Sequence, residues 1–241
     1  LGQSVGFGED SITNYASHFT RAELVHQVRH LPLHARFREE CAYQQHGPLV
    51  ATAILEQATG MAWEDFVEQR ICAPLGLRET WATYGRLADK SVACDPHMDL
   101  GDGRMTAIAH RNFDNLASTG AMVSSLRDME VWWDMFARGG AGLIRPETVA
   151  DMLAPRVPVR RDGIHPQRHM GRFLANFVSY GTGMFLHDFA GRLVAEHTGA
   201  LEGFYVVGCA VPAERLAVVV LTNQHGCACL PALRYHLLAQ I

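Results

Sequence analysis

Apolar residues recur at helical spacing through most of residues 20–155. A first helix is predicted to begin near Arg21 and to end at Pro32. Thr20 and Glu23 have the spacing of a capping box there, and proline cannot continue a helix. The same reasoning from apolar faces, caps and glycine or proline terminators predicts further helices over residues 48–60, 63–73, 125–140 and 146–153.

After Tyr180 the pattern changes to short extended runs of apolar residues. Strands are predicted over residues 183–189, 192–197, 204–211 and 215–222. Only residues 212–214 separate the last two, which predicts an antiparallel hairpin. A final helix over residues 230–238 would pack on this sheet.

Helices first and strands afterwards favour an α+β fold with one antiparallel sheet flanked by helices. We expect a single domain over residues 1–241, with a helical part over about 20–155 and a sheet with its closing helix over about 178–241. Residues 76–118 and 155–172 have few apolar periods, so they are predicted to be surface connections.

Charge and hydropathy argue against two kinds of partner. The 25 acidic and 21 basic residues give a formal net charge of −4, and no basic run could follow a phosphate backbone, so nucleic acid is not expected. The longest apolar run, residues 216–221, is too short to cross a membrane. Among the basic residues only Lys90 is a lysine.

Six cysteines lie along the chain without metal-type spacing. Because most have apolar neighbours, we expect buried thiols in a reducing compartment. The chain begins with Leu1 and shows no targeting signal, so we expect its N-terminus to be a cut. These observations leave the localisation open between cytoplasm and export.

Several short blocks occur in order along the chain. They are Phe37-Arg38, Tyr43-Gln44-Gln45, Ala58-Thr59-Gly60, Pro74-Leu75-Gly76-Leu77 with Thr80, Ser118-Thr119-Gly120-Ala121 with Asp128, Tyr180-Gly181-Thr182-Gly183, Glu196-His197-Thr198-Gly199, and residues 216–223. Each is weak alone, but in this order they resemble the penicillin-recognising serine hydrolases, close to the class C β-lactamase and esterase branch. The resemblance covers nearly the whole chain and implies a β-lactamase/transpeptidase-like fold.

Enzymes of that superfamily form an acyl-enzyme on the serine of an S-x-x-K motif, assisted by a Y-x-N tyrosine and a K/H-x-G strand. Tyr43 matches the motif tyrosine, which the resemblance implies is a general base and later a proton donor. Gln45 stands where the superfamily has an asparagine that binds the substrate amide. Its side chain is one methylene longer, which favours a drifted or inactive site. Taken alone, Tyr43 is as typical of a core residue beside Phe37.

His197-Thr198-Gly199 matches the third motif. The resemblance implies that His197 is an electrostatic partner of substrate and base, and that substrate lies against Thr198 and Gly199. Ala200 would then supply an oxyanion N–H. Outside that context the tripeptide is typical of an ordinary strand end before a turn.

The superfamily's nucleophile has no counterpart in these residues. Lys90 is the sole lysine and has Leu87 three positions before it, so no S-x-x-K motif occurs. We therefore expect a truncated domain that lacks the N-terminal strands and the S-x-x-K helix, and that is inactive by itself.

Two other patterns compete as sites. Residues 2–6 fit the G-x-S-x-G nucleophile elbow, with Ser4 and His197 as triad members, but they lack the strand that an elbow follows. His26, His30 and His34 repeat at four-residue spacing, yet a solvated helix face is favoured over a metal site. Aromatic residues at helical spacing are expected in the core: Trp132, Trp133 and Phe136.

Three hypotheses about function stay open. The first is a serine hydrolase that acts through an acyl-enzyme on β-lactams, D-amino-acid peptides or small esters. The second is a non-catalytic binding or interaction protein of the same fold, which Gln45 favours. The third is a truncated product without selected activity. We expect a small-molecule substrate as partner, no cofactor and no metal, and the oligomeric state stays open.

Overall fold

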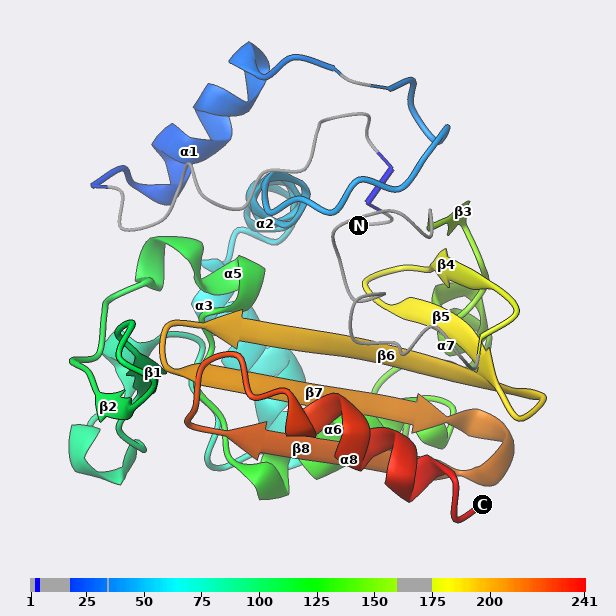
Figure 1. Cartoon of the computed structure of the whole chain (residues 1–241). Coiled ribbons are helices and arrows are strands. Elements are labelled where there is room, and N and C mark those ends of the chain that lie inside the picture. Colours follow the sequence, from blue (N-terminus) through cyan, green and yellow to red (C-terminus); the bar gives the residue numbers. More distant parts are fainter. Residues whose placement is uncertain (1–2, 5–17, 34, 160–174) are drawn as a thin grey trace.

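A six-stranded antiparallel sheet lies at the centre of the part of the chain that the structure describes (Figure 1). The structure is a computed structural model, and it describes residues 3–4, 18–33, 35–159 and 175–241. The strands follow one another across the sheet in sequence order. They are β3 (Val157–Pro158), β4 (Val178–Tyr180), β5 (Phe185–Phe189), β6 (Arg192–Leu201), β7 (Phe204–Val211) and β8 (Leu216–Thr222).

Helices cover both faces of this sheet. The α-helices are α1 (Arg21–Gln27), α2 (His46–Thr59), α3 (Trp63–Val67), α4 (Ala73–Leu75), α5 (Ala117–Gly120), α6 (Leu126–Ala137), α7 (Pro146–Met152) and α8 (Cys229–Leu238). Alternate side chains of β8 face different helices, because successive residues of a strand point to opposite faces. Ala217 and Val219 pack with α6, whereas Val218 and Val220 pack with α8. Figure 1 shows α8 in front of the sheet and α6 behind it.

The predicted helices are present, with one wrong boundary. The third was expected to end before Pro74, but a π-helical turn, Glu68–Cys72, carries it into α4. Pro74 therefore lies near the end of one continuous helical run, which stops at Gly76 in the left-handed conformation. The capping box of Thr20 and Glu23 forms as predicted, and α1 passes into a 3₁₀ turn, Val28–His30, before Pro32.

The predicted hairpin of β7 and β8 is confirmed, with Val211 paired to Leu216 beside its 3₁₀ connection, Pro212–Glu214. The second predicted strand, residues 192–197, was too short at its end. Pairing with β7 continues β6 to Leu201, so residues 197–200 all lie within the strand. The sequence also missed β3 and β4, and a small hairpin of β1 (His97–Asp99) and β2 (Met105–Ala107) inside the long connection. These strands have two or three residues, too few for an alternating pattern.

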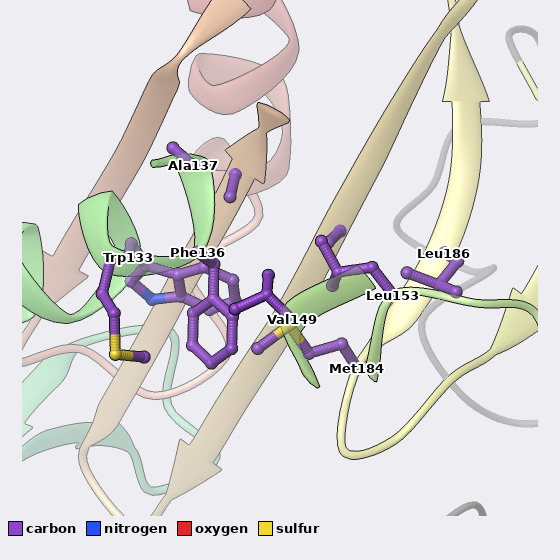
Figure 2. Close-up of a cluster of buried hydrophobic side chains, with 10 residues drawn as sticks. Trp133, Phe136, Ala137, Val149, Leu153, Met184 and Leu186 are labelled. Carbon is purple, nitrogen blue, oxygen red and sulfur yellow. The ribbon is translucent and has the colours of Figure 1, made fainter. Parts of the chain in front are cut away.

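The main core lies between α6, α7 and the sheet, as Figure 2 shows. The predicted core aromatics are there: Trp133 is 4% exposed and Phe136 1%, and Trp132 packs against them partly buried. Gly208 on β7 makes the close approach of Trp133 possible. A Cβ at that position would lie 1.9 Å from the indole Nε1.

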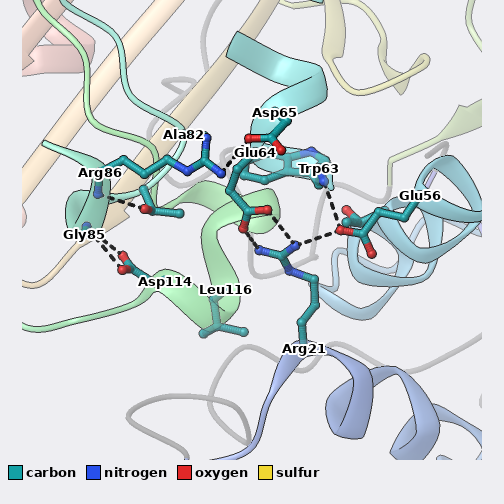
Figure 3. A network of polar contacts seen from close by, with 12 residues as sticks. Arg21, Glu56, Trp63, Glu64, Asp65, Ala82, Gly85, Arg86, Asp114 and Leu116 are labelled. Atoms are coloured by element: carbon teal, nitrogen blue, oxygen red, sulfur yellow. Dashed lines mark hydrogen bonds and ion pairs between the residues drawn. The ribbon is translucent and has the colours of Figure 1, made fainter. Parts of the chain in front are cut away.

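A polar network fastens α1 to the rest of the helical layer (Figure 3). The guanidinium of Arg21 pairs with Glu56 of α2 at 3.2 Å and with Glu64 of α3, and it lies over the Trp63 ring. Glu56 also accepts a hydrogen bond from the Trp63 backbone N–H at 2.9 Å. One arginine therefore joins three helices.

Two of the motif blocks meet at a buried carboxylate. Asp128 in the first turn of α6 is 3% exposed. Its Oδ2 accepts from the backbone N–H of Glu79 and from the Thr80 hydroxyl, both at 2.7 Å. Thr80 Oγ1 also lies 2.8 Å from Ser124 Oγ. These motif residues connect α6 to the long connection after α4.

Candidate substrate-binding site

The structure brings Tyr43 and His197, two predicted site residues, together. Tyr43 lies in the segment just before α2 and His197 lies on β6, and their ring centroids are 5.8 Å apart. Phe185 on β5 stacks with Tyr43 at 6.1 Å and lies 5.6 Å from His197. Phe37, the expected core neighbour of Tyr43, is 63% exposed, so that neighbour was wrong. Tyr43 does pack, partly buried, against a small core cluster that contains Tyr180 and Phe185.

Tyr180 is a fourth member of the cluster of Tyr43, Phe185 and His197. It begins one of the motif blocks, but the sequence alone predicted no role for it. It is buried on β4, and its hydroxyl lies 3.3 Å from His197 Nε2. Its ring also meets Phe185 edge to face at 4.6 Å. A tyrosine followed by glycine is too common a pattern to indicate this contact.

The hydrogen bonds of His197 define an uncharged ring. Nδ1 donates to the Thr198 carbonyl at 2.6 Å, which leaves Nε2 as an acceptor for the Tyr180 hydroxyl. Burial lowers the pKa of His197, against the opposing effects of the Thr198 carbonyl and the Glu196 carboxylate. At neutral pH the imidazole therefore acts through hydrogen bonds rather than through a positive charge.

Burial also raises the pKa of Tyr43. A phenol with a raised pKa is a poor general base unless a nearby cation stabilises its phenolate. The sole lysine is engaged elsewhere: Lys90 Nζ donates to the carbonyls of Tyr84 and Leu87 and lies over the Tyr84 ring. Lys90 therefore does not replace the lysine of the S-x-x-K motif as a cation next to Tyr43.

Gln45 precedes the first turn of α2 and is partly buried, beside Tyr43 in sequence. The neighbouring amide, Gln44, has a structural role. Its side-chain Oε1 accepts a hydrogen bond from the Gly47 backbone N–H at 2.7 Å, and the backbone N–H of Gln44 donates to Gln3 Oε1 at 3.1 Å. Gln3 is buried and also hydrogen-bonds Tyr180, so a residue near the start of the chain supports the site.

The three residues after His197 continue β6 along its pairing with β7. Thr198 is buried, Gly199 lies opposite Val206, and Ala200 is exposed. A Cβ on Gly199 would lie 2.9 Å from Val206 Cγ2, so the glycine makes room for a neighbouring strand residue. The strand thus leaves Ala200 exposed while it holds His197 in the aromatic cluster.

A buried group of charges lies directly behind His197. Glu196 is 0% exposed, pairs with Arg234 of α8, and lies 3.4 Å from His187 Nε2. Burial favours the neutral acid, but the charges of Arg234 and His187 outweigh it and hold the pKa of Glu196 below its ordinary value. The strand that carries His197 is therefore fixed to the C-terminal helix.

The competing sites gain no support from the structure. Ser4 offers its backbone carbonyl to the Arg38 N–H. The two motif glycines, Gly2 and Gly6, lie outside the described part, as does His34. Among the described residues, no three His, Cys, Asp or Glu side chains could hold a metal ion together. The helices that the structure describes are too short or too polar to span a membrane.

The expectation of buried thiols is correct for only two cysteines. Cys72 and Cys209 are buried, and burial raises the pKa of their thiols to about 11 and about 12. Cys94 and Cys229 are exposed, and the remaining two are partly buried. Apolar neighbours in sequence did not distinguish these cases, because exposure depends on how the residues around each cysteine pack in three dimensions.

The chain belongs to the Beta-lactamase family: the model of that family matches residues 2–239. A search of curated proteins finds no match by sequence. The fold is that of the β-lactamases and transpeptidases, and the family places the chain among the serine hydrolases.

Solved structures share this fold at low sequence identity. The octameric penicillin-binding protein homologue from Pyrococcus abyssi has a TM-score of 0.81 at 19% identity, over 100% of this chain and 55% of that one. D-amino acid amidase from Ochrobactrum anthropi, complexed with D-phenylalanine, has a TM-score of 0.76 at 19% identity, over 100% of this chain and 76% of that one. This chain thus spans only about half to three-quarters of their lengths.

Replacing Tyr180 with phenylalanine should raise the pKa of His197. The uncharged ring loses the hydroxyl that donates to Nε2, so protonation becomes less unfavourable. An NMR pH titration, with the His197 signal assigned through His197→Gln, measures the change. Tyr84→Phe removes a hydroxyl in the long connection and should leave that titration unchanged. If Tyr180→Phe behaves in the same way, the contact does not influence His197.

Proposed function

We propose that these residues form the substrate-binding part of a β-lactamase-family serine hydrolase, with Tyr43 and His197 at its centre. The observation that carries the proposal is the 5.8 Å approach of these two rings, which come from motif blocks more than half of the chain apart. Neither ring is needed there to fill the main core, which lies between α6, α7 and the sheet.

Amides of D-amino acids and penicillins are the ligands that we infer for this site. D-amino acid amidase and a D-stereospecific amidohydrolase from Streptomyces share the fold, with TM-scores of 0.76 and 0.70. In the proposed complex Tyr43 donates a hydrogen bond to the ligand, Gln45 contacts its amide, and the backbone of Ala200, an exposed residue, accommodates its carbonyl. Thr198 and Gly199 form the strand edge beside it.

The acyl-transfer step needs groups beyond these residues. The 241 residues contain no S-x-x-K motif, and Lys90 is held in the long connection. We therefore infer that this chain binds the ligand without being acylated by it. A second candidate, a binding protein without catalysis, is favoured by Gln45 in the asparagine position and by the raised pKa of Tyr43.

Binding is tested with D-phenylalanine amide and L-phenylalanine amide by ligand-observed NMR. We expect the D-form to bind more tightly, and Tyr43→Phe to weaken it roughly tenfold, about 1.4 kcal/mol, because one buried hydrogen bond is lost. Tyr84→Phe is the matched control and should bind as the unaltered protein does. Equal affinities for all three proteins would remove Tyr43 from the site.

Acylation is tested by intact mass after incubation with benzylpenicillin. We expect the mass of the chain to be unchanged. A covalent adduct would overturn the inference that these residues lack a working nucleophile, and its position would identify the serine. The binding-protein candidate further predicts no adduct in any upstream-extended form of the chain, even where an S-x-x-K motif is encoded.

A further inference from the structure

Two cysteine sulfurs lie in contact at the start of α8, away from the candidate site. Cys227 Sγ and Cys229 Sγ are 2.9 Å apart, closer than the van der Waals separation of two sulfur atoms and longer than the ~2.05 Å of a disulfide bond. Their exposure differs: Cys229 is exposed, whereas Cys227 is partly buried against Tyr205 and Leu230. One sulfur is thus open to small molecules, and the other lies beside it.

The connection that carries this pair is held in place. The His225 backbone N–H donates to the His97 carbonyl at 2.8 Å, and its Nδ1 donates to the Leu201 carbonyl at 3.0 Å. On the other side the Cys227 carbonyl accepts from the Leu230 N–H at 3.3 Å as α8 begins. Because both flanks are fixed, the two sulfurs keep a high effective concentration for each other.

We propose that Cys227 and Cys229 form a dithiol site that low-molecular-weight disulfides of the glutathione class oxidise reversibly to an intramolecular disulfide. The Cys229 thiolate attacks one sulfur of the small disulfide, whose S–S bond breaks and releases one thiolate. The Cys227 thiolate then attacks Cys229 Sγ, which forms the internal bond and releases the second thiolate. The two protons that the cysteines give up go to the two released thiolates, so one disulfide is reduced as one is formed.

The other cysteines do not offer this chemistry. Cys72 and Cys209 are buried, so a small disulfide has no access to their sulfurs. Cys94 is exposed but lies in the long connection between 3₁₀ turn Lys90–Val92 and β1, so it serves as a matched control. The site depends on the pair and not on exposure alone.

The test equilibrates the protein with reduced and oxidised glutathione, quenches with acid and N-ethylmaleimide, and digests with trypsin. Cleavage after Arg215 and Arg234 places both cysteines of the pair in one peptide, residues 216–234, which has no other cysteine. In oxidising mixtures we expect this peptide to lose the mass of two hydrogens and to take up no maleimide, and dithiothreitol should reverse the change. Cys94→Ser should behave in the same way.

Single variants separate the two steps. Cys227→Ser should accumulate a stable glutathione adduct on Cys229, because the resolving thiol is gone. Cys229→Ser should take up little glutathione, because Cys227 is partly buried. The proposal is overturned if the peptide of the unaltered protein keeps both thiols or stays glutathionylated in oxidising mixtures, or if its disulfide partner is Cys94. The digest of the unaltered protein decides these outcomes even if a variant fails to fold.

Discussion

Replacement of Arg234 by leucine is expected to lower the free energy of unfolding by about 3–5 kcal/mol. The guanidinium and the Glu196 carboxylate form an ion pair whose side chains are both 1% exposed. Leucine restores the apolar volume but leaves the carboxylate buried with His187 as its nearest possible partner, at 3.4 Å. Urea denaturation followed by circular dichroism measures the loss.

Arg192→Leu is the control for this variant. Arg192 pairs with Glu214 at 2.5 Å, but both side chains are about one-third exposed, so its removal should cost less than about 1 kcal/mol. Arg234→Leu combined with Glu196→Leu should recover part of the stability, since no charge is then left in the interior. Equal losses in the free energy of unfolding for Arg192→Leu and Arg234→Leu would show that the buried pair of Arg234 and Glu196 stabilises the fold no more than the exposed pair does.

The same pair predicts a pH dependence with a defined sign. Because the pKa of Glu196 is lowered by folding, its stabilisation is present above the ordinary glutamate pKa and is lost as pH falls through the lowered value. In Arg234→Leu burial is no longer opposed by the guanidinium, and only the weaker effects of His187 and His197 remain, so the pKa of Glu196 should rise. The stability deficit of this variant should therefore be greatest in neutral buffer and shrink in mildly acidic buffer. A deficit that is constant with pH would contradict this account.

Replacement of Asp128 by alanine is expected to cost about 3 kcal/mol of the free energy of unfolding. The change leaves two donors, the Glu79 N–H and the Thr80 hydroxyl, without their buried acceptor, and each such loss costs about 1–3 kcal/mol. It also removes a negative charge from the first turn of α6, which the helix dipole favours. Thermal and urea denaturation measure the change.

Asp134→Ala on the same helix is the matched control. The Asp134 side chain is 39% exposed and pairs with Arg138 one turn later at 2.5 Å, so its loss should cost at most about 0.5 kcal/mol. Asp128→Asn keeps one acceptor oxygen and should fall between the two alanine variants. If Asp128→Ala is no more destabilising than the control, the carboxylate does not hold the connection to α6.

The fold was predictable where apolar residues recur over several turns or strand pairs. The amphipathic pattern around Trp133 and the hairpin from Phe204 to Thr222 both formed as expected. The three-residue strands β1, β2 and β4 were not predictable, because their pairing comes from tertiary packing rather than from their own sequence. The helical boundary at Pro74 was missed because a π turn has no strong local signal.

The candidate site was predictable only through the motif blocks. Spacing alone could not place Tyr43 near His197, since the two are joined by packing on β5 and not by any local element. The Tyr180 hydroxyl and the Gln3 amide were missed for the same reason, although both support the predicted residues. The charge state of His197 likewise follows from its partners in three dimensions.

The separation of Tyr43 and His197 along the chain has a consequence for ligand screening. Their rings meet only in the folded protein, so a compound that contacts both binds the native state and not the unfolded chain. Such a compound raises the apparent stability by RT ln(1 + [L]/Kd), about 2.7 kcal/mol at a hundredfold excess over Kd. Thermal shift measurements can therefore detect ligands of this site before any turnover is known, and Tyr43→Phe should diminish the shift.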